Sequence, residues 1–317
     1  MLYSPQPMHI PDGFLSTLVS LVLWAVSIVG VGYALRRVGQ DIGERQVPLM
    51  GVLAAAIFAG QMLNFSVTGG TSGHLLGAAI ATILLGPWAA VIVMTSVVSI
   101  QALIFQDGGL LALGANLFNM AIIGVAVSYF VFVTLRRLAR GRSWGVFLGG
   151  SAAAWASILI ASLACGLELA ISGTSPANIA VPAMAGIHAL IGVGEALITL
   201  GALGFLQATR RDLVQVGGAA PKAGAAVWAF GLGIAALLAV LSPLASANPD
   251  GLEWVAERSG FLDAVRAPLF NVIPDYVFPG ISNSALATIV AGILGTLLVF
   301  GVALGVAHAR RGRKSSV

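Results

Sequence analysis

The chain contains little charge and almost no cysteine. Charged residues make up 9% of its 317 residues, and there are one cysteine and four histidines. The single cysteine, Cys165, excludes an intramolecular disulfide and a Cys-x-x-Cys metal site. Because it lies within an apolar run, we interpret it as a small core residue. So few charges, together with 58% hydrophobic residues, exclude an ordinary soluble domain.

Two motifs that would indicate catalysis are also missing. The sequence has no Gly-x-x-x-x-Gly-Lys-Ser/Thr loop, so the chain is not expected to hydrolyse a nucleotide by itself. It has no His-Glu-x-x-His motif either, and a metalloenzyme would need a third ligand, an open coordination position and a general base. We therefore predict that the chain is not an enzyme.

Long apolar segments dominate the sequence, and its mean hydropathy is +0.97. The segments lie at residues 14–35, 47–65, 74–105, 112–134, 145–171, 179–207, 225–245 and 284–308. Segment 74–105 is too long for one ordinary crossing and is broken by Gly86 and Pro87, so it predicts two short crossings or a re-entrant hairpin. The sequence thus predicts an all-α polytopic membrane protein with about nine transmembrane segments.

Basic residues between the apolar segments predict the topology. They form four clusters, namely Arg36, Arg37 and Arg45; Arg136, Arg137, Arg140 and Arg142; Arg210, Arg211 and Lys222; and Arg310, Arg311, Arg313 and Lys314. Cytoplasmic loops are enriched in Lys and Arg. We therefore expect the N-terminus outside and the C-terminus in the cytoplasm. Because the net charge of +4 arises from these clusters, no nucleic-acid partner is expected.

This topology brings two of the four histidines to one side of the membrane. His9 precedes the first apolar segment and His74 follows the polar loop 66–73, so both are predicted on the external face. The loop 106–109 faces the same side. Polar backbone at membrane depth is tolerated where it is buried in protein or lines a cavity. We expect an external vestibule in which His9 and His74 share a metal ion, because neutral imidazole suits Ni, Cu, Zn and Co(II).

Ionisable residues within apolar segments are expensive and often functional. His188 and Glu195 occur in segment 179–207 at a spacing of about two helical turns, on one face. They are too far apart to touch, so we expect them to brace the bundle or to have an intramembrane function. In segment 47–65, Ala55 and Ala59 form a small-residue face for close packing. Its neighbour is expected to be either a partner subunit or another helix of this chain.

Four blocks of the sequence resemble one family. They are MHIPDGFLS from Met8, NFSVTGGTSGHLLGAAIATILLGPW from Asn64, QALIFQDGGLLALGANLFNMAIIG from Gln101 and GIHALIGVGEALIT from Gly186. Together they resemble the substrate-capture (S) subunit of cobalt/nickel energy-coupling-factor transporters, the CbiM/NikM family, over roughly residues 8–211. The resemblance implies a seven-helix capture domain, which we assign to residues 8–215.

The C-terminal part resembles a second family. The blocks PDGLEWVAERSG from Pro249 and PDYVFPGI from Pro274 are similar to the small PDGLE-type accessory subunit of these transporters (NikN/CbiN-like). The chain therefore resembles a fusion, with a linker at 216–224 and a two-helix accessory domain at 225–317. The expected external loop, 246–283, carries Asp250, Glu253, Glu257, Asp263 and Asp275.

The resemblance also implies the metal ligands. In the family the ion is held by the amine of the initiating Met, the next backbone amide, the side chain of the adjacent His, and one more His after a glycine-rich loop. These correspond here to Met8, His9 and His74. Nitrogen donors in a near-planar arrangement favour Ni(II). Four polar residues are expected to orient the ligands: Asp12, Asn64, Ser72 and Gln101.

An amine ligand at Met8 requires that Met8 be the first residue of the mature chain. Residues 1–7 have neither an apolar core nor a basic start, so they do not form a signal peptide. We expect translation to begin at Met8 and residues 1–7 to be a non-native or wrongly assigned extension.

The leading hypothesis is a substrate-binding component of an ATP-driven importer of Ni(II) or Co(II) in the cell membrane of a prokaryote. The metal is the transported substrate, and no organic cofactor is expected. The expected partners are a transmembrane coupling subunit and two ABC-type ATPase subunits. The alternative is an autonomous secondary transporter or channel for divalent transition metals. That class predicts ionisable residues spaced through several helices, whereas the apolar segments offer little beyond Glu168, His188 and Glu195.

Overall fold

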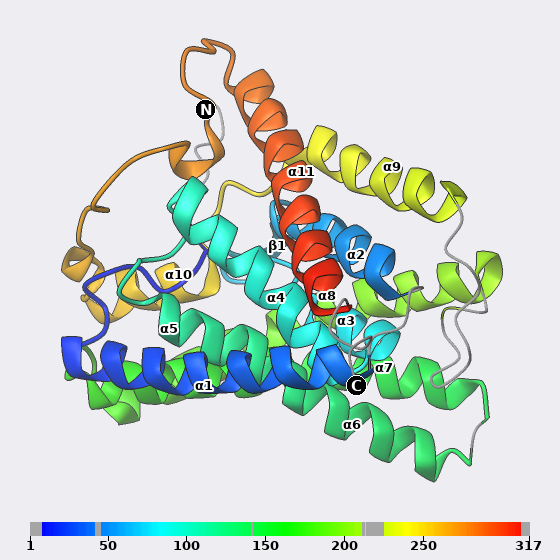
Figure 1. Ribbon diagram of the computed structural model, residues 1–317. Coiled ribbons are helices and arrows are strands. Elements are labelled where there is room, and N and C mark those ends of the chain that lie inside the picture. Colours follow the sequence, from blue (N-terminus) through cyan, green and yellow to red (C-terminus); the bar gives the residue numbers. More distant parts are fainter. Residues whose placement is uncertain (1–7, 42–45, 141, 211–212, 214–224, 312–317) are drawn as a thin grey trace.

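The computed structural model describes residues 8–41, 46–140, 142–210, 213 and 225–311 (Figure 1). The long helices are α1 (Thr17–Asp41), α2 (Gln46–Gln61), α4 (Pro87–Ile100), α6 (Gly124–Leu138), α7 (Trp144–Ile171), α8 (Ala177–Thr209), α9 (Ala225–Leu241) and α11 (Ser284–Arg311). The short elements are β1 (Phe65–Val67), β2 (Thr71–Gly73), α3 (Ala78–Leu85), η1 (Gln101–Phe105), α5 (Leu113–Asn116), η2 (Leu117–Ile123), η4 (Ser242–Leu244), α10 (Gly251–Ser259), η5 (Leu262–Ala264) and η6 (Pro274–Tyr276). The expected N-terminal extension and the expected linker 216–224 lie outside the described residues.

Six helical stretches of the described chain are long and apolar enough to cross a membrane. They are Thr17–Gly39, Pro87–Phe105, Leu113–Leu138, Trp144–Ile171, Ala177–Thr209 and Ser284–Arg310, and the apolar helices α2 and α9 are shorter. Large apolar side chains such as Leu18, Phe130 and Leu197 are more than half exposed on the outer surface, as lipid contact requires. A mainly helical, multi-pass fold is therefore confirmed. The count of nine crossings and the orientation stay predictions.

The break predicted in segment 74–105 lies at Gly86. This residue has φ +80° and separates α3 from α4, and Pro87 occupies the first turn of α4, where its missing N–H costs no hydrogen bond. With eight residues, α3 is only about 12 Å long and does not cross a bilayer alone. Helix α3 is therefore too short for one of the two predicted crossings, whereas Pro87–Phe105 is long and apolar enough for the other.

The polar loop 66–73 forms a short β-hairpin within the mainly helical fold. Strands β1 and β2 pair antiparallel there, with Phe65 opposite Gly73 and Val67 opposite Thr71. Gly69 and Gly70 have φ of +100° and +81°, which lets the chain reverse direction between the strands without a Cβ clash. The hairpin leads directly into His74.

The C-terminal part packs on the rest of the chain through α2. Figure 1 shows α9 and α11 beside α2 on one side of the molecule, and both helices contact it. Ala55 and Ala59 of α2 are fully buried against Ala235 and Ala239 of α9. Of the two expected neighbours of this face, the structure therefore shows another helix of the same chain.

Candidate metal-capture site

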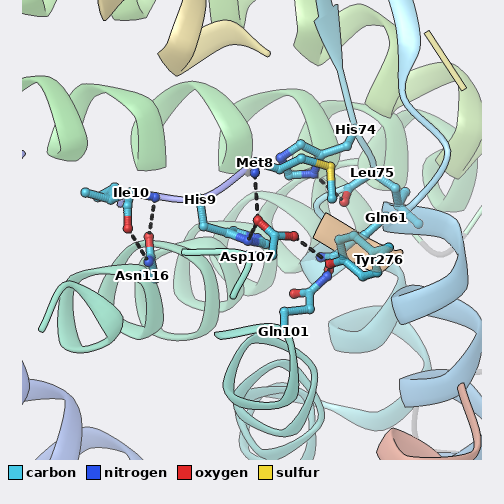
Figure 2. A network of polar contacts seen from close by, with 10 residues as sticks. All are labelled: Met8, His9, Ile10, Gln61, His74, Leu75, Gln101, Asp107, Asn116 and Tyr276. Atoms are coloured by element: carbon cyan, nitrogen blue, oxygen red, sulfur yellow. Dashed lines mark hydrogen bonds and ion pairs between the residues drawn. The ribbon is translucent and has the colours of Figure 1, made fainter. Parts of the chain in front are cut away.

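The N-terminal segment before α1 is held inside the protein. Met8 and His9 are 6% and 4% exposed. The backbone N of Ile10 donates to Oδ1 of Asn116 at 3.0 Å, and Asn116 Nδ2 donates back to the Ile10 carbonyl at 3.1 Å. The N–H of Gly109 also donates to this carbonyl, at 2.9 Å. These bonds fix the main chain directly after His9, and Figure 2 shows the two that involve Asn116.

Asp107 is the residue on which the N-terminal segment converges. The backbone N of Met8 donates to Asp107 Oδ1 at 2.6 Å, and His9 Nδ1 lies 2.9 Å from the same oxygen. Because an ionised carboxylate only accepts hydrogen bonds, Nδ1 of His9 is the donor in this pair. Two of the nitrogens assigned to the metal thus point at one oxygen atom (Figure 2).

The charges of this buried pair support each other. Burial alone would lower the pKa of His9, but the charge and the hydrogen bond of Asp107 outweigh burial and raise it. Burial acts in the opposite direction on Asp107, yet the charge of His9 and the hydrogen bonds from His9, Tyr276 and Met8 hold its pKa below the usual range. The site therefore provides a fixed negative charge beside its nitrogen atoms.

His74 reaches the same place from the end of the β-hairpin. Its ring centroid lies 5.6 Å from that of His9, with the two planes at 64°. Its Nδ1 is 3.1 Å from the Leu75 carbonyl, so Nδ1 carries the proton in this contact, and the ring also interacts with the backbone of Met8. Burial, followed by the nearby charge of His9, lowers the pKa of His74 to about 4. The structure thus brings together the two histidines that the sequence suggested, with His74 in its neutral form.

Tyr276 belongs to the C-terminal part and completes the bonding of Asp107. Its phenol donates to Asp107 Oδ2 at 2.6 Å, and its ring stacks on Phe105 with centroids 4.8 Å apart. Tyr276 is 2% exposed. Both Asp275 and Tyr276 have positive φ, +53° and +58°, a conformation that costs energy for residues other than glycine. The surrounding contacts hold this strained turn where the phenol meets the carboxylate.

A second contact joins the C-terminal part to the hairpin that carries His74. The N–H of Ser72 donates to the Pro249 carbonyl at 2.8 Å, and the Ser72 hydroxyl donates to the Asn248 carbonyl at 2.9 Å. The segment before α10 thus meets β2 through a single parallel bridge between Ser72 and Asp250. Asp250 then caps α10 by accepting the N–H of Glu253 at 2.7 Å, and burial raises the pKa of Asp250 to about 8.

The four residues expected to orient the ligands have other main partners. Ser72 binds the C-terminal part, as described above. Asp12 accepts the N–H groups of Leu110 and Ala112 at 3.1 and 3.0 Å and so fixes the loop after Asp107. Gln101 Nε2 donates to the side-chain oxygen of Gln61, and the carbonyl of Asn64 accepts the N–H of Ser246. Among the described residues, none of the four is hydrogen-bonded to Met8, His9 or His74. The carbonyl of Gln101 does accept the N–H of Asp107, the residue that binds the N-terminal segment.

The two intramembrane residues of α8 do not act as a pair. His188 Nδ1 is bound to the Met184 carbonyl of its own helix at 2.8 Å. The carboxyl of Glu195 accepts the N–H groups of Leu76 and Gly77 at 2.8 and 3.0 Å. Glu195 therefore contacts the chain next to His74, while His188 lies beside Gly251 of the C-terminal part.

Two cavities flank the ligands. A cavity of about 580 Å³ lies between the N-terminal segment and the C-terminal part, and His9, Asp250, Glu253 and Asp275 line it. A second cavity, of about 90 Å³, is lined by Met8, His9 and His74. Arg266 also lines the larger cavity, so its lining carries charges of both signs. The cavity gives a hydrated cation room to approach His9.

The sequence did not point to Asp107 and Tyr276 as site residues. In the sequence Asp107 is one residue of the predicted external loop 106–109. The presence of a carboxylate on the same face as the predicted metal site is the one feature that could have identified it. Tyr276 carried no signal of its own, because a single tyrosine in a loop has no motif.

Two family models together match nearly the whole chain. The cobalt uptake substrate-specific transmembrane region (CbiM) matches residues 9–213, and the PDGLE domain matches residues 225–312. The putative fused nickel transport protein NikMN of Archaeoglobus fulgidus is 38% identical over 309 residues, which cover 96% of this chain and 99% of that protein. The fused nickel transport protein NikMN of Rhodobacter capsulatus is 32% identical, covering 94% of this chain and 96% of that one.

Solved structures agree with these relatives. The crystal structure of a transition metal transporter has 34% sequence identity and a TM-score of 0.57, and the match covers 66% of this chain and 96% of that one. A truncated transition metal transporter has a TM-score of 0.56 at the same identity. The chain belongs to the family of nickel and cobalt transport proteins, as a CbiM-type transmembrane region fused to a PDGLE domain.

Proposed function

We propose that the chain captures Ni(II) or Co(II) as the membrane-embedded substrate-binding component of an ATP-driven importer. The observation that carries this proposal is the convergence of Met8 N and His9 Nδ1 on one carboxylate oxygen, with the His74 ring beside them. These nitrogen donors suit late first-row divalent metals, whereas Mg²⁺ and Ca²⁺ prefer oxygen ligands.

The donor set must include main-chain nitrogen. In the described part of the chain, no group of three or more His, Cys, Asp or Glu side chains is arranged to hold a metal ion. In this proposal the nitrogen of Met8 and the amide and side chain of His9 supply what the two histidine rings lack. The metal takes the place of the protons that Met8 N and His9 Nδ1 now share with Asp107. The Met8 nitrogen is an amine ligand when Met8 begins the mature chain, and N-terminal sequencing or intact mass of the purified protein tests this.

Transport requires subunits that supply energy. The sequence lacks a nucleotide-binding loop, so we propose a transmembrane coupling subunit and two ABC-type ATPase subunits as partners. The relatives come from an archaeon and a bacterium, which supports the cell membrane of a prokaryote as the location. Among the described residues, the buried ionisable groups of α7 and α8 have local partners and form no relay across the bundle, which argues against an autonomous secondary transporter.

Calorimetric titration of Ni(II) and Co(II) into the purified chain beginning at Met8 tests the capture step. We expect His9→Ala and His74→Ala each to weaken metal binding strongly, to an affinity that the titration still measures. His308→Ala, near the end of α11, is the matched control and should bind as the parent does. Unchanged affinity in both site variants would refute the proposal. Uptake of radioactive nickel by cells with and without the ATPase subunits tests the energy source, because uptake that persists without them would favour a secondary transporter.

A further inference from the structure

The main chain that follows His74 is held by side chains and not by regular structure. Residues 74–77 lie between the end of β2 and the start of α3. The N–H groups of Leu76 and Gly77 donate to the two carboxyl oxygens of Glu195, at 2.8 and 3.0 Å. The Leu76 carbonyl accepts Gln61 Nε2 at 2.9 Å. Two residues, one on α8 and one on α2, thus fix the path of the chain beside His74.

Glu195 is well placed to hold this segment. Its side chain is fully buried, and its two oxygens bind two consecutive N–H groups at the point where α3 begins. N–H groups at the start of a helix lack partners within the helix and favour a negative charge. Without the carboxyl, two buried donors would lose their acceptors. Gly77 has φ +81°, so the chain turns sharply here and needs to be held in this conformation.

The second buried glutamate of the capture domain provides a contrast. Glu168 of α7 is 6% exposed and accepts a hydrogen bond from Asn119 Nδ2 at 2.8 Å. Its hydrogen-bond partner lies in η2 and not in a segment that carries a metal ligand. If metal binding needed only a buried carboxyl, replacing either glutamate would weaken it. If it needs the hydrogen bonds to the segment after His74, only replacement of Glu195 would weaken it.

We propose that Glu195 is a positioning residue for the metal ligand His74, holding its ring toward His9 through the main chain of Leu76 and Gly77. The inference rests on the proposed function, because it assigns to Glu195 a role in metal capture. It also means that the main chain directly after His74 is tied to α8.

The test compares Glu195→Gln, Glu195→Asp and the control Glu168→Gln in Ni(II) titrations of the purified full chain. Glutamine keeps the size of the side chain but sets an NH₂ group against one of the two N–H donors. Partners that orient metal ligands typically contribute about 10- to 100-fold to affinity, and we expect a loss in this range for Glu195→Gln. Aspartate, which keeps both acceptor oxygens on a shorter side chain, should recover part of the affinity. Glu168→Gln should bind as the parent does.

A cycle with His74→Ala separates positioning from general support of the fold. If Glu195 acts through His74, adding Glu195→Gln to His74→Ala should cause no further loss of affinity. The visible absorption spectrum of bound Ni(II) should also change in Glu195→Gln, since the position of a nitrogen donor changes. An additive cycle, or parental affinity and spectrum in Glu195→Gln, would overturn the inference while His74→Ala still upheld the metal site. Absence of Ni(II) binding by the parent would instead refute the proposed function.

Discussion

The phenol of Tyr276 donates to Oδ2 of Asp107 at 2.6 Å, while Oδ1 of the same carboxylate receives Met8 and His9. One carboxylate therefore joins the N-terminal ligand segment to the C-terminal PDGLE domain. Since the carboxylate is 1% exposed, its oxygens depend on these protein donors. The PDGLE domain is thus in contact with the group that holds the ligands, although the sequence suggested only a loop outside the membrane.

Replacing Asp107 tests its role as the anchor of the ligand segment. In Asp107→Asn the side chain keeps its size but loses the negative charge beside the nitrogen donors. We expect Ni(II) affinity to fall by about 10- to 100-fold, the usual effect of removing a partner of a metal ligand. Calorimetric titration measures this. Asp263→Asn, an exposed position in η5, is the control, and equal affinity of the two variants would show that Asp107 does not support the site.

Removing the phenol oxygen of Tyr276 tests the contact between the two domains. Tyr276→Phe keeps the stack on Phe105 but leaves Asp107 Oδ2 buried without that donor. A lost partner of this kind costs about 1–3 kcal/mol, so we expect a lower midpoint of thermal unfolding and weaker Ni(II) binding. Tyr129→Phe, at a partly exposed ring on α6, should change neither quantity. A Tyr276→Phe protein that matches the parent in both measurements would mean that this bond is dispensable.

The helices were largely predictable because each one is a long apolar run with a clear end. The segment expected at 145–171 forms α7 at Trp144–Ile171, and Gly86 with Pro87 marked the only internal break expected. His9 and His74 were expected on one face from the charge of the connecting loops alone. Local composition and charge therefore carried most of the architecture.

The remaining parts depend on contacts between distant segments. Neither Asp107 nor Tyr276 shows in its own neighbourhood that the two will meet, because the bond joins a capture-domain loop to a strained turn of the PDGLE domain. The strands β1 and β2 have three residues each, which is too short for a periodic signal. The small face of α2 was visible, but its partner became evident only with α9 placed beside it.

Gly251 tests whether the PDGLE domain must approach α8 closely. A Cβ at this position would lie 2.7 Å from Ile191 Cδ1 and 2.9 Å from His188 Cε1, so Gly251→Ala requires these residues or the PDGLE domain to move. Overpacking of this kind costs about 1–3 kcal/mol. We expect faster cleavage between α10 and α11 in limited proteolysis. Gly233→Ala is the control, because no atom lies within 4 Å of a Cβ added there; equal cleavage rates would contradict a tight contact.

Ala59 tests whether the small-residue face of α2 packs on α9 of the same chain or on a separate subunit. Ala59→Leu places a larger side chain against the buried alanines of α9, Ala235 and Ala239. Such overpacking typically costs about 1–3 kcal/mol of stability. The isolated chain should therefore unfold at a lower temperature, even without other subunits. Ala25→Leu, on the exposed face of α1, should leave the midpoint unchanged. If the face of α2 served a separate subunit instead, Ala59→Leu would leave the isolated chain as stable as the parent and reduce only metal uptake by the assembled transporter.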